Sequence, residues 1–150
     1  MEVIATFLIS GVPRVKKNNQ RVVVARTRAG KPYPRKVDTK AYKEWRDGFY
    51  DRSGKKHIGA IVQIERQKPQ FEIDFPINLA CRFYMDTTGV VDLSALYEGI
   101  QDELVSANVL TDDNYTIVAS HDGSGVFVDK ANPRMEITIT RKVLESEKAN

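Results

Sequence analysis

The chain has 150 residues, of which 41% are hydrophobic and 29% charged, an ordinary composition for one globular domain that buries a core. No apolar run approaches the roughly 18 residues that span a bilayer, so we expect no membrane partner. The first residues show neither a basic segment nor a cleavage pattern, so we expect no export signal, and the single cysteine, Cys81, excludes an internal disulfide. Both features predict a cytoplasmic protein, in which Cys81 is a small core residue.

The formal net charge is only +3, but the two halves of the chain differ strongly. Residues 1–70 contain 17 Lys and Arg against 6 Asp and Glu, whereas residues 71–150 contain 6 against 14. Such asymmetry predicts a surface for a polyanion, joined to an acidic region with another task. The alternative is a solvated basic face that has no partner.

The first strands are predicted from apolar runs and the turns between them. Residues 3–9 are mostly apolar and predict a strand, and residues 21–26 contain a β-branched run that predicts another after a polar loop. Gly30 and the prolines at 32 and 34 interrupt this pattern.

A helix is predicted from Asp38 or Thr39, either of which can cap it, to about Asp51. The apolar positions of this segment recur at helical spacing, which favours the core over base stacking for its aromatic residues: Ala41, Tyr42, Trp45 and Phe49. A loop at residues 53–57 follows, and then a short strand or helix at residues 58–64.

The second half predicts one long helix among strands. Leucine, tyrosine and isoleucine recur at spacings of three and four between Asp92 and Ala107, which is typical of a helix that packs on a sheet. Strands are predicted at residues 77–85, 115–119, 126–128 and 135–140, and the charged tail from Leu144 is expected to fray. We therefore expect a single-domain α+β fold over residues 1–150, with a mixed or antiparallel sheet and two main helices.

Three aspartates flank the long helix and are candidates for a metal site. Asp92 begins it, and Asp112 and Asp113 follow it; a helix of this length is roughly 24 Å long, and an extended segment from Asn108 to Asp113 reaches back roughly 20 Å. The geometry permits the carboxylates to meet. The alternatives are an N-cap at Asp92 and a polar turn at Asp112 and Asp113.

Several stretches, in order along nearly the whole chain, resemble one family. They are residues 11–18 (GVPRVKKN), 42–45 (YKEW), 92–113 (DLSALYEGIQDELVSANVLTDD) and 132–134 (NPR). This set is similar to the RusA-like Holliday-junction resolvases, including those of phages, in which Asp-x-Asp-Asn at a helix start is followed by a lysine and a later Asp-Asp pair. The resemblance implies the RusA-like fold, a homodimer, and paired, metal-dependent cuts at a four-way DNA junction during recombination and repair.

The resemblance also implies the site residues. It assigns catalysis to Asp92 and Asp113, and metal binding to Asp92, Asp112 and Asp113, with Mg²⁺ as cofactor or Mn²⁺ in its place; Asp102 matches a further acid of the pattern. The sequence departs from the pattern at three positions, because Ser94 stands for the second aspartate, Ala95 for the asparagine and Glu98 for the lysine.

Glu98 is the residue that could offset these departures. Ser94 and Glu98 are one turn apart on one helix face, and helical side chains lean toward the N-terminus, so Glu98 can replace the missing catalytic acid. The alternative is that Glu98 is a solvated surface acid in a protein that binds branched DNA without cleaving it.

Basic residues on the polar loop and the following hairpin are the predicted nucleic-acid contacts. The main candidates are Lys16, Lys17, Asn18, Arg21, Arg26 and Arg28, because basic loops follow phosphates and give affinity without sequence information. A basic module that binds RNA or protein remains the other alternative. His57 and His121 lack Cys or His partners at ligand spacing, and no Gly-rich phosphate loop occurs, so we expect neither zinc nor a small-molecule cofactor.

Overall fold

The computed structural model describes residues 2–16 and 20–143, without the side chains of residues 20–22 and 36, so the tail from Leu144 lies outside the described residues. Within this range the chain forms nine strands and three helices. In chain order they are β1 (Val3–Ser10), β2 (Gln20–Arg26), β3 (Pro32–Asp38), α1 (Lys40–Asp47), β4 (Gly48–Tyr50), β5 (Lys56–Ile58), α2 (Ala60–Gln67), β6 (Ile77–Met85), α3 (Leu93–Ser106), β7 (Val118–Ser120), β8 (Gly125–Val128) and β9 (Arg134–Arg141).

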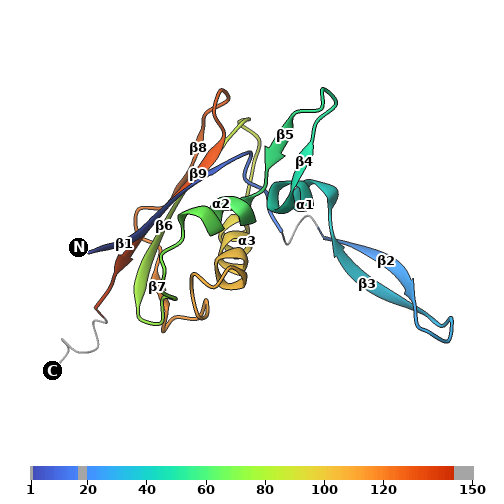
Figure 1. The fold of residues 1–150 in the computed structure, drawn as a ribbon, viewed down its shortest axis with the longest axis horizontal. Coiled ribbons are helices and arrows are strands. Elements are labelled where there is room, and N and C mark those ends of the chain that lie inside the picture. Colours follow the sequence, from blue (N-terminus) through green and yellow to red (C-terminus); the bar gives the residue numbers. More distant parts are fainter. Residues whose placement is uncertain (1, 17–19, 144–150) are drawn as a thin grey trace.

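The main sheet has five strands and is mixed, which confirms the predicted α+β class. Its strand order is β1-β9-β6-β7, and β8 pairs with the far end of β6. β9 is antiparallel to both β1 and β6, whereas β7 and β8 run parallel to β6. α3 connects β6 to this parallel edge and packs along the sheet (Figure 1). The segment after residue 58, for which the sequence predicted a short strand or a helix, forms the short helix α2 beside the two predicted helices.

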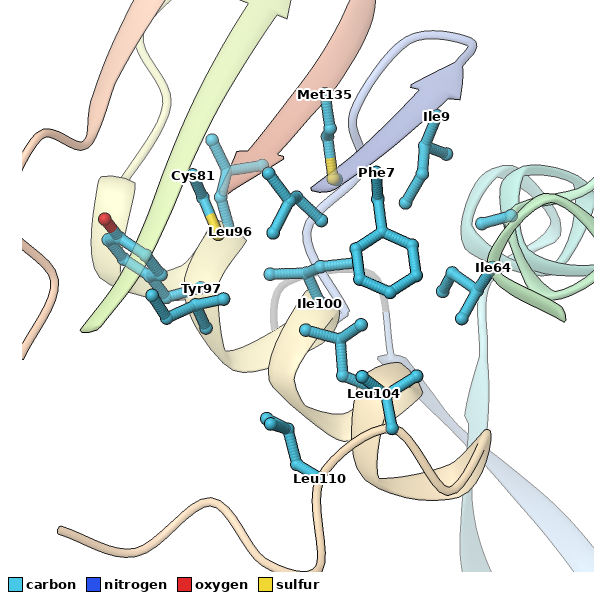
Figure 2. Close-up of a cluster of buried hydrophobic side chains, with 14 of the residues drawn as sticks. Phe7, Ile9, Ile64, Cys81, Leu96, Tyr97, Ile100, Leu104, Leu110 and Met135 are labelled. Carbon is cyan, nitrogen blue, oxygen red and sulfur yellow. The ribbon is translucent and has the colours of Figure 1, made fainter. Parts of the chain in front are cut away.

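The core lies between the sheet and the helices. Alternate residues of β9 are buried, which is the pattern of a strand with one face in the core. Figure 2 shows the sheet and helix side chains that meet there, among them Phe7, Ile9, Met135, Leu96, Ile100 and Leu104. Burying each side chain of this size contributes about 1.5–3 kcal/mol to the free energy of unfolding. Cys81 is fully buried, as predicted, and burial raises the pKa of its thiol.

A buried hydrogen bond joins α1 to α3. The Tyr42 hydroxyl donates to Glu103 Oε1 at 2.7 Å, and both residues are almost fully buried. Burial, together with this hydrogen bond and the charge of Glu103, raises the pKa of the Tyr42 phenol. Tyr42 and Trp45 are core residues, which confirms the interpretation of their helical spacing. α1 is thereby fixed on the body at the point where the β2–β3 hairpin leaves it.

α2 protects the outer edge of β1. The side-chain amide of Gln67 accepts from the backbone amide of Leu8 at 2.7 Å and donates to its carbonyl at 2.8 Å. Gln63 accepts from the amide of Ser10 at 2.7 Å. The two glutamines act as a substitute for a neighbouring strand, and so they cover groups that an edge strand otherwise leaves free to pair with another chain.

The hairpin inferred after the polar loop is confirmed, and the prolines at 32 and 34, which were expected to interrupt the pattern, lie within its second strand. β3 begins at Pro32, and Pro32 and Pro34 pair with Arg26 and Val24 of β2. Thr27 donates to the Lys31 carbonyl at 2.9 Å, one pair further along. In an antiparallel ladder, hydrogen-bonded and non-bonded pairs alternate, so both prolines occupy non-bonded positions where no N–H is required.

The first helix is shorter than predicted, because α1 ends at Asp47. Gly48 has φ +90°, and a Cβ at this position would lie 2.6 Å from the carbonyl oxygen of His57. The chain then forms the β4–β5 hairpin, so Phe49 is not on the α1 face and His57 is not in a loop.

The fourth predicted strand is also shorter than expected. Residues 115–117 belong to a turn, and β7 begins only at Val118. Within residues 2–16 and 20–143, no helix combines the length and the apolar character needed to cross a membrane.

Candidate functional site

The most prominent surface feature is the β2–β3 hairpin, which we call the basic ribbon (residues 20–38). It extends away from the body of the molecule and forms a separate two-stranded sheet (Figure 1). Its described basic side chains are exposed: Arg26, Arg28, Lys31 and Arg35. The sequence contains no Asp or Glu between residues 3 and 37, so no acid within the ribbon neutralises these charges before Asp38.

The tip of the ribbon is held by local hydrogen bonds. The Lys31 amide donates to Thr27 Oγ1 at 3.1 Å, and the Gly30 amide donates to the Thr27 carbonyl at 2.9 Å. Gly30 has φ +83°, a conformation that favours glycine. The Arg26 guanidinium donates to the Gly30 carbonyl at 3.0 Å. Arg28 is thus presented at an ordered turn.

The predicted nucleic-acid contacts fall into three groups. Arg26 and Arg28 lie on the exposed ribbon; Arg21 belongs to β2, but its side chain is outside the described part, as are Lys17 and Asn18 entirely. Lys16 lies on the body, where its ammonium pairs with Asp102 Oδ2 at 3.2 Å. Lys16 is therefore engaged within the protein and is a weaker candidate for phosphate binding than the sequence indicated.

Asp92 occupies the N-cap of α3. Its Oδ1 accepts from the backbone amide of Ser94 at 3.1 Å and from the Ser94 hydroxyl at 2.8 Å. This is the capping alternative that the sequence left open, and it also occupies the serine that stands in the family's second aspartate position. Glu98 is exposed, one turn further along α3.

Asp112 and Asp113 form a polar turn beyond the other end of α3. Asp112 Oδ1 accepts from the Asp113 amide at 2.7 Å, and Asp112 Oδ2 accepts from the Asn114 side chain at 3.0 Å. Partial desolvation, followed by the effects of Asp112 and Asp102, raises the pKa of the Asp113 carboxyl. Asp102, whose charge contributes to this shift, lies in the second half of the helix.

The chain does not return from α3 toward Asp92 as the extended path would require. Asn108 turns it with φ +59°, and residues 109 and 111 pair with Ile73 in a parallel bridge beside the helix end. Asp102 is ten residues beyond Asp92, which is about 15 Å along the helix axis.

The expected grouping of Asp92 with Asp112 and Asp113 is therefore not formed. Among the described residues, no three His, Cys, Asp or Glu side chains lie close enough together to hold a metal ion. Mg²⁺ in proteins is bound through oxygen ligands that converge on one point. The cap at Asp92 and the Lys16 ion pair at Asp102 occupy two of these carboxylates, so the acids that the structure describes do not fit the metal that the family resemblance implies.

Comparison with known proteins adds no support to the resemblance to RusA-like resolvases, which rests on the matching residues alone. No family model matches the sequence, and a search of curated proteins found no match.

Proposed function

We propose that this protein binds branched DNA, and that the basic ribbon supplies the main contact with the duplex arms. The observation that carries the proposal is the ribbon itself, which projects from the body and exposes four described cations with no acid among them. The major groove of B-DNA, about 12 Å wide, admits a two-stranded β-ribbon. Lys and Arg on such a ribbon bind phosphates and release condensed counterions, which gives affinity for any sequence.

The preference for a branched substrate rests on the resemblance to RusA-like resolvases. A four-way junction has two-fold symmetry, so a homodimer presents one ribbon to each of two equivalent arms. We expect this complex to act on recombination or repair intermediates in the cytoplasm.

Binding without cleavage is the form of the proposal that the geometry favours. The resemblance also implies Mg²⁺-dependent cutting by Asp92, Asp113 and Glu98, but Asp92 caps α3 far from the Asp112–Asp113 turn. The three departures from the family pattern, at Ser94, Ala95 and Glu98, agree with this separation.

A gel-shift and cleavage assay on synthetic four-way junctions tests the proposal. The protein should retard the junction in EDTA more strongly than a linear duplex or an RNA hairpin of equal length. With Mg²⁺ or Mn²⁺ the junction should remain uncut. Paired symmetric cuts that are lost in Asp92→Asn would restore the nuclease interpretation, and tighter binding of the RNA would favour the basic RNA-binding module.

A further inference from the structure

A pocket on the body lies next to the base of the basic ribbon and has no role in the contacts described above. Its volume is about 780 Å³, and residues from α1, α2, the β4–β5 hairpin and the end of β1 line it. Pockets of 300–1,000 Å³ are typical of sites for small organic molecules. β3 leads directly into α1, and α1 is only eight residues long, about 12 Å, so the ribbon and the pocket are within reach of one DNA strand.

One wall of the pocket is a pair of flat rings. Phe49 and His57 are opposite each other on β4 and β5, and their rings stack 4.6 Å apart with an interplanar angle of 5°. His57 is held in this orientation by Asp51, whose Oδ2 lies 2.9 Å from His57 Nε2. Phe49 keeps 37% of its surface exposed although it contacts another ring. A fixed and partly exposed aromatic stack is a surface on which a nucleobase can stack.

The residues that line the pocket also carry a net positive charge. Arg14, Lys56 and Arg66 line it, and Glu44 is the single carboxylate among its lining residues. A second hollow of about 210 Å³ shares the aromatic pair as well as Lys56 and Arg66, and Asp47 is the single carboxylate that lines it. The stack therefore has cations within the same two hollows, which suits a ligand that combines a flat ring with a negatively charged backbone.

We propose that this pocket binds an unpaired nucleotide of the DNA, with its base on the Phe49–His57 stack and its phosphates at Arg14, Lys56 and Arg66. The inference rests on the proposed function and deepens it, because opening a base pair where duplex arms meet exposes an unpaired nucleotide. The ribbon supplies affinity for the arms, and the pocket supplies recognition of the branch.

The test uses two probes that separate the pocket from the ribbon. A fluorescent 20-bp duplex reports on the ribbon, and a thymidylate tetranucleotide reports on the pocket, because the arginines of the ribbon tip lie a seven-residue strand, about 23 Å, beyond the base of the ribbon. Removing one stacking side chain reduces affinity by about 5- to 150-fold per base. Phe49→Ala and Arg66→Ala should each weaken tetranucleotide binding by at least the lower figure, while duplex binding stays within twofold of wild type.

Matched controls keep the outcome decisive. Arg66→Ala removes an exposed charge from a helix that tolerates alanine, so this variant should fold. The test of the pocket therefore remains valid even if Phe49→Ala does not fold. Arg52→Ala, at the exposed turn of the β4–β5 hairpin, should change the binding of neither probe. The ribbon variant Arg26→Ala/Arg28→Ala should lose duplex binding and retain tetranucleotide binding.

Three results would overturn the proposal. The first is tetranucleotide binding that survives both pocket variants, and the second is an equal loss of affinity for both probes in these variants. The third is displacement of the tetranucleotide by an oligoglutamate peptide of equal charge at lower concentration, which would assign the pocket to an acidic protein. If the wild-type protein bound the tetranucleotide but not the duplex, the role of the ribbon would be refuted instead.

Discussion

Asp113 carries a carboxyl whose ionisation opposes folding. Its pKa is raised in the folded protein, first by desolvation and then by Asp112 and Asp102, so the folded state holds the proton more tightly than the unfolded chain. Ionised Asp113 therefore lowers stability above the folded pKa, and the cost disappears at a pH below the unfolded pKa, where both states are protonated.

The variant Asp113→Asn should consequently be slightly more stable than wild type at pH 7. We expect a gain within about 0.5 kcal/mol, the usual range for exposed positions, and no gain near pH 3, where the carboxyl is protonated in both states. Thermal unfolding at the two pH values measures this. If millimolar Mg²⁺ stabilised wild type and not the variant, Asp113 would belong to a metal site after all.

At the scale of a single element, Asp92 determines where α3 begins. Its carboxylate accepts from the Ser94 amide and from the Ser94 hydroxyl, and so it satisfies one of the backbone donors that the first turn leaves free. Asp92→Ala should lower the free energy of unfolding by about 0.5–2 kcal/mol, whereas Asp92→Asn, which keeps a good cap, should change it little. Urea unfolding compares the two. An equal loss in both variants would show that the negative charge matters and the cap does not.

Strong local patterns allowed most elements of this fold to be predicted. α3 follows from its apolar spacing, and β6 and β9 follow from apolar or alternating runs, because each pattern reports burial against one neighbour. β3 was implied by the inferred hairpin, but its bounds were not predicted, because Pro32 and Pro34 are tolerated only at non-bonded positions of the hairpin, which depend on register. The end of α1 depends on Gly48, whose close approach to His57 is a tertiary contact.

The candidate site could be predicted only in part, for a related reason. The cap at Asp92 and the turn at Asp112 are local, and the sequence contained both as alternatives. Whether the acids meet depends on the path after Asn108, and a bridge to Ile73, 35 or more residues earlier in the chain, determines that path. The aromatic pair of Phe49 and His57 was likewise invisible, because it exists only once two three-residue strands pair.

The whole molecule separates an acidic, well-packed body from a basic arm. An isolated two-stranded hairpin is at best marginally stable in water, so the basic ribbon gains from a partner that covers it. In the proposed complex, duplex DNA provides that cover together with the opposite charge. We expect a homodimer with two such arms as the working unit on a junction, with a mass by light scattering of two chains per junction.

The salt dependence of junction binding tests the central role of the ribbon most directly. Each phosphate contact adds about 0.9 to the slope of log affinity against log salt on duplex DNA. Arg26→Ala/Arg28→Ala should therefore flatten the slope by about 1.8 per bound copy, as measured by fluorescence anisotropy over a KCl series. The control Arg52→Ala/Lys130→Ala, which removes two exposed charges from the body, should leave the slope unchanged. An unaltered slope in the ribbon variant, or an equal change in the control, would contradict DNA binding by the ribbon.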